Sequence, residues 1–133
     1  MRAWLYQMSA SEWPPERYRE EVWEGQPTRW PAGRIAGDDD PAEGDMFFAW
    51  YAKTRCDDPG LYGWGVVVRG MNEFGELHWM PVFPSDYLKM HPLFDEELDG
   101  LVAGIRGPVA QGTMWAIHTP QVRELRARVR GHV

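Results

Sequence analysis

Two apolar segments rich in aromatic residues lie close together near the middle of the chain and constrain its fold more than any other feature. Residues 46–53 read MFFAWYAK and residues 61–69 read LYGWGVVVR, with a polar loop between them. Segments of this length and of this aromatic and β-branched content predict β-strands. Both alternating faces of residues 46–53 are apolar at the start, so we predict a central strand that is buried on two sides.

Gly63 and Gly65 fall inside the second segment, on one face of the predicted strand. A glycine within a strand marks a bend or a close approach of another backbone, and a sheet that curls needs such points. A turn at residues 70–75 leads to a third apolar segment, residues 76–83, in which Pro81 indicates an edge strand or a bulge. These segments predict a curved meander of three strands.

The rest of the chain predicts short elements, because 11 prolines and 14 glycines are spread along its 133 residues. We expect further strands at residues 2–8 and 113–118, and helices or helical turns at residues 14–22, 85–90, 95–102 and 120–130. Thr119 is the expected N-cap of the last helix, with Pro120 at its first position. Residues 24–45 read as loop throughout. The order predicts one α+β domain over residues 1–133, with a barrel-like sheet and peripheral short helices.

Charge and composition limit the classes of partner. The formal net charge of −6 opposes non-specific binding to nucleic acid, although residues 122–133 carry four arginines and one glutamate and leave room for a local basic surface. A single cysteine excludes an internal disulfide, and no apolar run is long enough to span a membrane. We therefore expect a cytoplasmic protein.

Catalytic and metal-binding motifs are missing from the sequence. No serine, cysteine or histidine stands in a nucleophile elbow or triad pattern, and the four histidines do not show the close spacing of metal ligands. The glycines of residues 60–65 lie within a predicted strand, not at the turn where a phosphate-binding loop would place them. The acidic run at residues 38–40 is read as a solvated turn. We expect no enzyme activity, no cofactor and no metal.

Five motifs span nearly the whole chain: in order they are WLYQMSASEW, VWEGQPTRW, GDMFFAWYAKT, DPGLYGWGVVV and QGTMWAIHTPQVREL. Taken together in this order, they resemble EVE domains, a family of the PUA-like superfamily. The resemblance implies a curved pseudo-barrel with helices packed around it and a pocket that reads a nucleobase, often a modified one. YTH-type RNA readers are relatives with an aromatic cage. The chain departs from the family where Gln7 to Ala10 replace K-S-E-P and where residues 26–34 replace the R-N-Y-Q-A-R-N pocket loop.

A base pocket needs rings for the two faces of the base and polar groups for its edge. With the resemblance as guide, we expect a base-binding pocket built from Gln7, Ser9, Trp30, Trp50, Tyr62 and Trp64. Arg29 and Lys53 are candidate phosphate contacts. Trp50 and Trp64 suit a hydrophobic core equally well, while Trp30 stands in an expected loop and favours a pocket or a surface. The expected partner is nucleic acid or a nucleotide bound through a single extruded base.

Three other functions stay open. The same pocket could hold a free metabolite, the protein could have an enzymatic site that no motif reveals, and the tryptophans could form a surface for a protein partner. A salt-dependent affinity would favour phosphate contacts over a neutral metabolite. A flat patch of exposed rings, in place of a deep pocket with a polar rim, would favour the interaction surface.

Overall fold

The computed structural model describes residues 2–31, 34–36, 39–54, 56–82, 84–105 and 112–131. Seven strands form one mixed sheet in the order β2-β6-β5-β4-β1-β7-β3. The strands are β1 (Ala3–Gln7), β2 (Thr28–Pro31), β3 (Arg34–Ile35), β4 (Met46–Tyr51), β5 (Gly60–Arg69), β6 (Glu76–Val82) and β7 (Thr113–Ile117). The helices are α1 (Pro15–Glu21), α2 (Ser85–Met90), α3 (Glu96–Ile105) and α4 (Thr119–Arg130). The α+β class expected from the sequence is confirmed.

The sheet curls strongly, and Pro31 and Arg34 show why it must. Pro31 ends one edge strand and Arg34 begins the other, so the two edges are joined by only two residues. The Cα atoms of Pro31 and Arg34 can therefore lie no more than about 11 Å apart, whereas the edges of a flat sheet of seven strands lie about 29 Å apart. The edge strands do not pair with each other among the described residues, so the curl is not closed.

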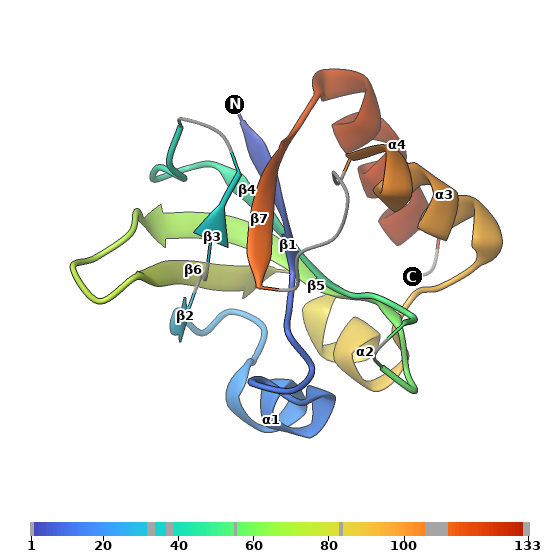
Figure 1. The fold of residues 1–133 in the computed structure, drawn as a ribbon, viewed down its shortest axis with the longest axis horizontal. Coiled ribbons are helices and arrows are strands. Elements are labelled where there is room, and N and C mark those ends of the chain that lie inside the picture. Colours follow the sequence, from blue (N-terminus) through green and yellow to red (C-terminus); the bar gives the residue numbers. More distant parts are fainter. Residues whose placement is uncertain are drawn as a thin grey trace.

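Alternation along the strands sorts the large side chains between two cores. The concave interior holds an aromatic cluster that includes Trp4, Tyr6, Phe47, Tyr51, Tyr62 and Trp79, and Tyr18 and Val22 of α1 cover one end of it. The convex face holds a second cluster that includes Leu5, Phe48, Trp50 and Leu61. Residues of α2, α3 and α4 pack on this second cluster, and Figure 1 shows α3 and α4 on the same side of the sheet. Burial on both faces explains the continuous apolar sequence of β4.

Gly65 provides the close approach of two backbones that the sequence predicts within β5. A Cβ atom at this position would lie 2.0 Å from the carbonyl oxygen of Met80 in β6, so only glycine fits. At Gly63 an added Cβ would lie 2.8 Å from the Tyr18 hydroxyl, which shows how closely α1 packs on the strand. The meander β4-β5-β6 is antiparallel, as the sequence predicts.

Three local expectations from the sequence are corrected. Residues 24–45 are not loop throughout, because Thr28–Pro31 pair with β6 and Arg34–Ile35 pair with β7. β6 is not an edge strand, because it pairs with both β2 and β5. The pairing with β2 ends at Trp79, however, so among the described residues β6 has only one neighbouring strand at Pro81. The last helix begins at Thr119, so its N-cap is His118, whose backbone N–H donates a hydrogen bond to Gln121 Oε1 at 3.3 Å.

Candidate functional site

A polar pocket lies where the parallel strands β1 and β4 end. β1 and β4 run parallel, so their carboxyl ends meet at one edge of the fold, beside the start of α1. In open sheets with parallel strands, ligands bind preferentially at this edge. The pocket has a volume of about 190 Å³ and is lined by Ala10, Pro15, Glu16, Arg19, Cys56, Asp57 and Asp58. It is therefore built from the segment after β1, the first turns of α1 and the loop between β4 and β5.

Arg19 of α1 fixes the geometry of the pocket wall. Its Nη2 donates hydrogen bonds to Asp58 Oδ2 at 3.1 Å and to the Tyr62 hydroxyl at 3.2 Å, and its Nε donates to the Lys89 carbonyl at 2.9 Å. The Tyr62 hydroxyl in turn donates to the Asp58 carbonyl at 2.5 Å. These bonds hold the guanidinium in place and pair it with one carboxylate.

Glu16 and Asp57 are the carboxylates of the pocket that remain unpaired. Neither has a hydrogen bond or an ion pair with any part of the chain that the structure describes. Since Arg19 is already paired with Asp58, the lining has an excess of negative charge. A ligand with amino hydrogens or a positive charge fits such a lining better than an anion does.

The Cys56 thiol also faces the pocket, and its environment makes it a weak nucleophile. Its Sγ donates a hydrogen bond to the Asp58 carbonyl at 3.3 Å. Burial raises the pKa of the Cys56 thiol, and the negative charge of Asp58 adds to this, while Arg19 opposes it. Because the thiolate is the reactive form, the group stays largely protonated at neutral pH.

The three tryptophans expected to form one cage lie in different places. Trp30 is a strand residue of β2, not a loop residue; it is only 1% exposed and packs in the interior against Trp13, with ring centroids 4.0 Å apart. Trp50 has no exposed surface and packs on the convex face near Phe94. Trp64 is half-buried on the convex face and stacks on Phe48. Strand alternation separates Trp30 from Trp50, so the structure does not contain the expected cage.

The other expected pocket residues divide in the same way. Gln7 is buried on the convex side, opposite Trp50 of β4 and Thr113 of β7 in the sheet register. Ser9 is buried, and its hydroxyl lies 3.0 Å from the hydroxyl of Ser11. Ser9 directly precedes Ala10, which lines the pocket. Tyr62 does not line the pocket, but it is hydrogen-bonded to two residues that do, Arg19 and Asp58.

The two expected phosphate contacts lie apart from the pocket. The Lys53 ammonium is 3.4 Å from Asp99 and 3.8 Å from Glu96 of α3, so carboxylates already compensate its charge. Arg29 extends from β2 into a separate hollow that it shares with Arg69 and His78. Among the described residues, no group of three metal-binding side chains is formed, and no helix has the length and apolar character needed to cross a membrane.

The sequence did not reveal Arg19, Asp57 and Asp58 as pocket residues. The parallel pairing of β1 with β4 joins residues more than forty positions apart, and no local pattern announces it. One signal was available in retrospect: a proline-led helix start and an acidic loop each follow directly on an expected strand. Such positions are where polar groups gather once the two strands are known to be parallel.

Comparison with known proteins shows the fold alone. No family model matches the sequence, and no curated protein matches it. Two solved structures are similar over nearly their whole length. Protein PSPTO5229 from Pseudomonas syringae has a TM-score of 0.50 at 17% identity, and the match covers 94% of this chain and 97% of that one. Rpa0253 from Rhodopseudomonas palustris has a TM-score of 0.51 at 11% identity, and the match covers 98% of this chain and 94% of that one.

Proposed function

We propose that this protein binds a single nucleobase, without catalysis, in the pocket at the carboxyl ends of β1 and β4. The observation that carries the proposal is the lining, which sets one guanidinium among carboxylates in about 190 Å³. Pockets for drug-sized ligands measure about 300–1,000 Å³, so this one suits a single ring system. Carboxylates accept hydrogen bonds from the amino groups of bases, and arginine donates to carbonyl oxygens and ring nitrogens.

The pocket favours a particular kind of base. Glu16 and Asp57 offer unpaired acceptors, so a base with an exocyclic amino group, or one that methylation has made cationic, is preferred over a base that offers acceptors alone. No aromatic side chain is among the lining residues that the structure describes, so recognition depends on the base edge more than on stacking. The same negative charge disfavours a phosphate inside this pocket.

The resemblance to EVE domains supports the proposal from a second direction. The five motifs fall on β1 and the segment after it, the segment from the end of α1 into β2, β4, β5 and the β7–α4 unit. Two of them contain lining residues of the pocket, Ala10 and Asp58. A PUA-like pseudo-barrel is part of the proposal, and the strongly curled sheet is compatible with it. The analogy raises the expectation of base binding but specifies no ligand.

Cys56 provides a site-specific test, because it is the single cysteine of the chain and lines the pocket. The rate at which iodoacetamide alkylates Cys56 is measured with adenosine, guanosine, cytidine, their N-methylated forms and uridine. We expect saturable protection by amino-bearing or cationic nucleosides and little by uridine. The double variant Glu16→Gln, Asp57→Asn should lose this protection, while Glu43→Gln, an exposed carboxylate outside the pocket, should keep it. A thiol that no nucleoside protects rejects the proposal.

The free-metabolite alternative uses the same pocket and is separated by comparing substrates. Short single-stranded oligonucleotides are tested beside the nucleosides over a range of salt concentrations. Tighter binding of the oligonucleotide, with an affinity that falls as salt rises, indicates nucleic acid. Equal affinity without salt dependence indicates a free nucleoside.

A further inference from the structure

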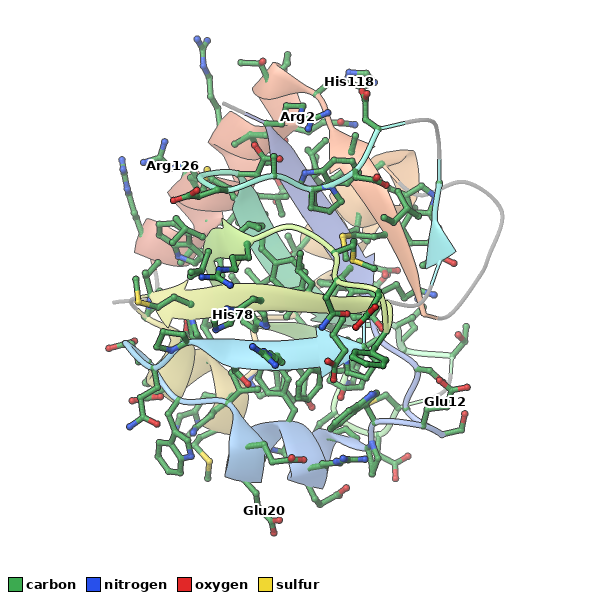
Figure 2. All side chains as sticks on the ribbon, turned by 90° about the vertical axis from the view of Figure 1, so that its left-hand side faces the viewer. Arg2, Glu12, Glu20, His78, His118 and Arg126 are labelled. Carbon is green, nitrogen blue, oxygen red and sulfur yellow. The ribbon has the colours of Figure 1, made fainter. Side chains whose placement is uncertain are left out.

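A second polar site lies on the outer surface of strands β2, β6 and β5. In the sheet register, His78 of β6 is directly opposite Arg29 of β2 on one side and Arg69 of β5 on the other. Residues directly opposite each other in antiparallel strands share a face, with Cβ atoms about 5 Å apart. Three nitrogen-rich side chains therefore form one row across three strands. Figure 2 views the molecule from this side, and His78 lies on the near face.

The row borders a small hollow of about 70 Å³. Its lining consists of Arg29, Arg69, Gly70, Asn72, Glu76 and His78. None of these residues belongs to the pocket at the ends of β1 and β4. A hollow of this size admits a small polyatomic ion or one group of a larger ligand, and it is too small for a nucleobase.

Neither arginine of this row forms an ion pair within the described part of the chain. Neither Arg29 nor Arg69 lies within ion-pair distance of a described carboxylate, whereas Arg2, Arg17, Arg19 and Arg128 all do. The two arginines lie on either side of His78, on the strands that flank β6. In addition, Nδ1 of His78 is buried without a hydrogen-bond partner, which is a costly state for a polar atom. An anion in the hollow would compensate the two guanidinium charges.

Glu76 is the one carboxylate among the described lining residues, and it accepts a hydrogen bond from Asn72. Asn72 Nδ2 donates to Glu76 Oε1 at 3.0 Å, and Asn72 Oδ1 accepts from the backbone N–H groups of Phe74 and Glu76 at 2.9 Å each. These bonds order the turn between β5 and β6 and tie the carboxylate to it. With His78 neutral, two guanidinium groups and one carboxylate still leave the hollow positive.

We propose that Arg29, His78 and Arg69 form a binding site for a single phosphate group. Two guanidinium forks can each donate paired hydrogen bonds to phosphate oxygens, and the imidazole lies between them to donate a further one. The site does not depend on base binding elsewhere, since the two sites share no residue.

The test follows the His78 imidazole signals by NMR as inorganic phosphate is added to the whole protein, with His78→Gln to assign them. We expect a saturable shift. Arg29→Gln and Arg69→Gln should each weaken the response about tenfold or more, as loss of a charge-assisted hydrogen bond does. Glu76→Gln should strengthen it, because the carboxylate repels the anion. Arg123→Gln is the matched control, since this exposed arginine of α4 has no ion pair among the described residues and lies outside the hollow.

A nucleoside 5′-monophosphate and a short oligonucleotide then distinguish the source of the phosphate. A stronger response to the monophosphate indicates a terminal phosphate, and a stronger response to the oligonucleotide indicates a backbone diester. The proposal fails if His78 responds to none of the three ligands. It fails equally if Arg123→Gln weakens binding as much as Arg29→Gln, because the effect would then be one of overall charge.

Discussion

The Tyr6 hydroxyl in β1 donates a hydrogen bond of 2.6 Å to the Pro31 carbonyl at the end of β2. Three strands, β4, β5 and β6, lie between β1 and β2 in the sheet order, so this bond crosses the interior of the curl. Pro31 belongs to an edge strand and is followed within three residues by the opposite edge. The bond therefore ties the curl together at the point where its two edges approach.

Replacing Tyr6 with phenylalanine removes this bond and leaves the ring in place. We expect Tyr6→Phe to lower the free energy of unfolding by about 1–2 kcal/mol, because the Pro31 carbonyl loses its partner in a partly buried position. Urea denaturation followed by circular dichroism measures the change. Tyr87→Phe is the matched control, since Tyr87 is exposed and its hydroxyl has no hydrogen bond in the described structure. If both variants lose the same free energy of unfolding, the hydrogen bond from Tyr6 to Pro31 does not stabilise the fold.

Gly65 is the residue at which the close packing of β5 on β6 should be least tolerant of change. In Gly65→Ala the new methyl group would overlap the Met80 carbonyl, and because that atom is backbone the two strands must move apart. We expect a loss of about 2–4 kcal/mol of stability. Gly100→Ala in α3 meets nothing within 4 Å and should instead raise stability by up to about 1 kcal/mol. Thermal unfolding of the two variants checks both signs.

Local patterns in the sequence were sufficient for most of the fold. The apolar runs around Phe48 and Val67 predicted β4 and β5, and the interior glycines predicted their curvature, because these signals lie within one element. β2 escaped detection, since Pro27, Pro31 and the glycines around them look like a loop and the strand exists only through its pairing with β6. Short strands of this kind are fixed by tertiary contacts and not by their own propensity.

The candidate site could be predicted far less well than the fold. Identifying a pocket requires knowing which faces and strand ends meet, and the chain gives this only through the long-range pairing of β1 with β4. The abundance of tryptophan drew attention to rings that the fold uses for packing, such as Trp50. The polar residues that do line a pocket, Arg19 and Asp57 among them, stand in ordinary-looking helix and loop sequence.

The buried tyrosines make stability sensitive to alkaline pH. Burial raises the pKa values of Tyr6, Tyr18, Tyr51 and Tyr62 well above the ordinary value of about 10. A raised pKa in the folded state means that the unfolded chain releases these protons first. Their stabilising contribution is complete below about pH 10 and is lost as pH rises above it, at up to about 1.4 kcal/mol per pH unit for each tyrosine.

Absorbance at 295 nm and urea unfolding between pH 9 and 12 measure this effect together. We expect these four hydroxyls to ionise only as the protein unfolds, in one cooperative step. Tyr6→Phe should remove one proton from that step and make the loss of stability less steep. Gradual ionisation of all four groups while the circular dichroism spectrum stays native would show that burial does not control them.

Cys56 should react slowly with alkylating reagents at neutral pH. Burial raises its pKa, so the rate should climb with pH through a midpoint above that of a free cysteine. Arg19 opposes this rise, and Arg19→Gln should therefore move the midpoint higher still. The rate of iodoacetamide alkylation from pH 7 to 10 gives both midpoints, with circular dichroism to verify that the variant is folded. A midpoint below that of glutathione would contradict the geometry.

Trp50→Phe separates packing from ligand binding. Trp50 is fully buried on the convex face and does not line the pocket, so we expect a loss of about 1–3 kcal/mol of stability but less than a twofold change in the nucleoside concentration that protects Cys56. Glu16→Gln with Asp57→Asn should show the reverse, with stability nearly unchanged and protection lost, because both carboxylates are exposed and unpaired. If folded Trp50→Phe loses protection while the carboxylate variant keeps it, the base binds at the convex face and the pocket assignment is wrong.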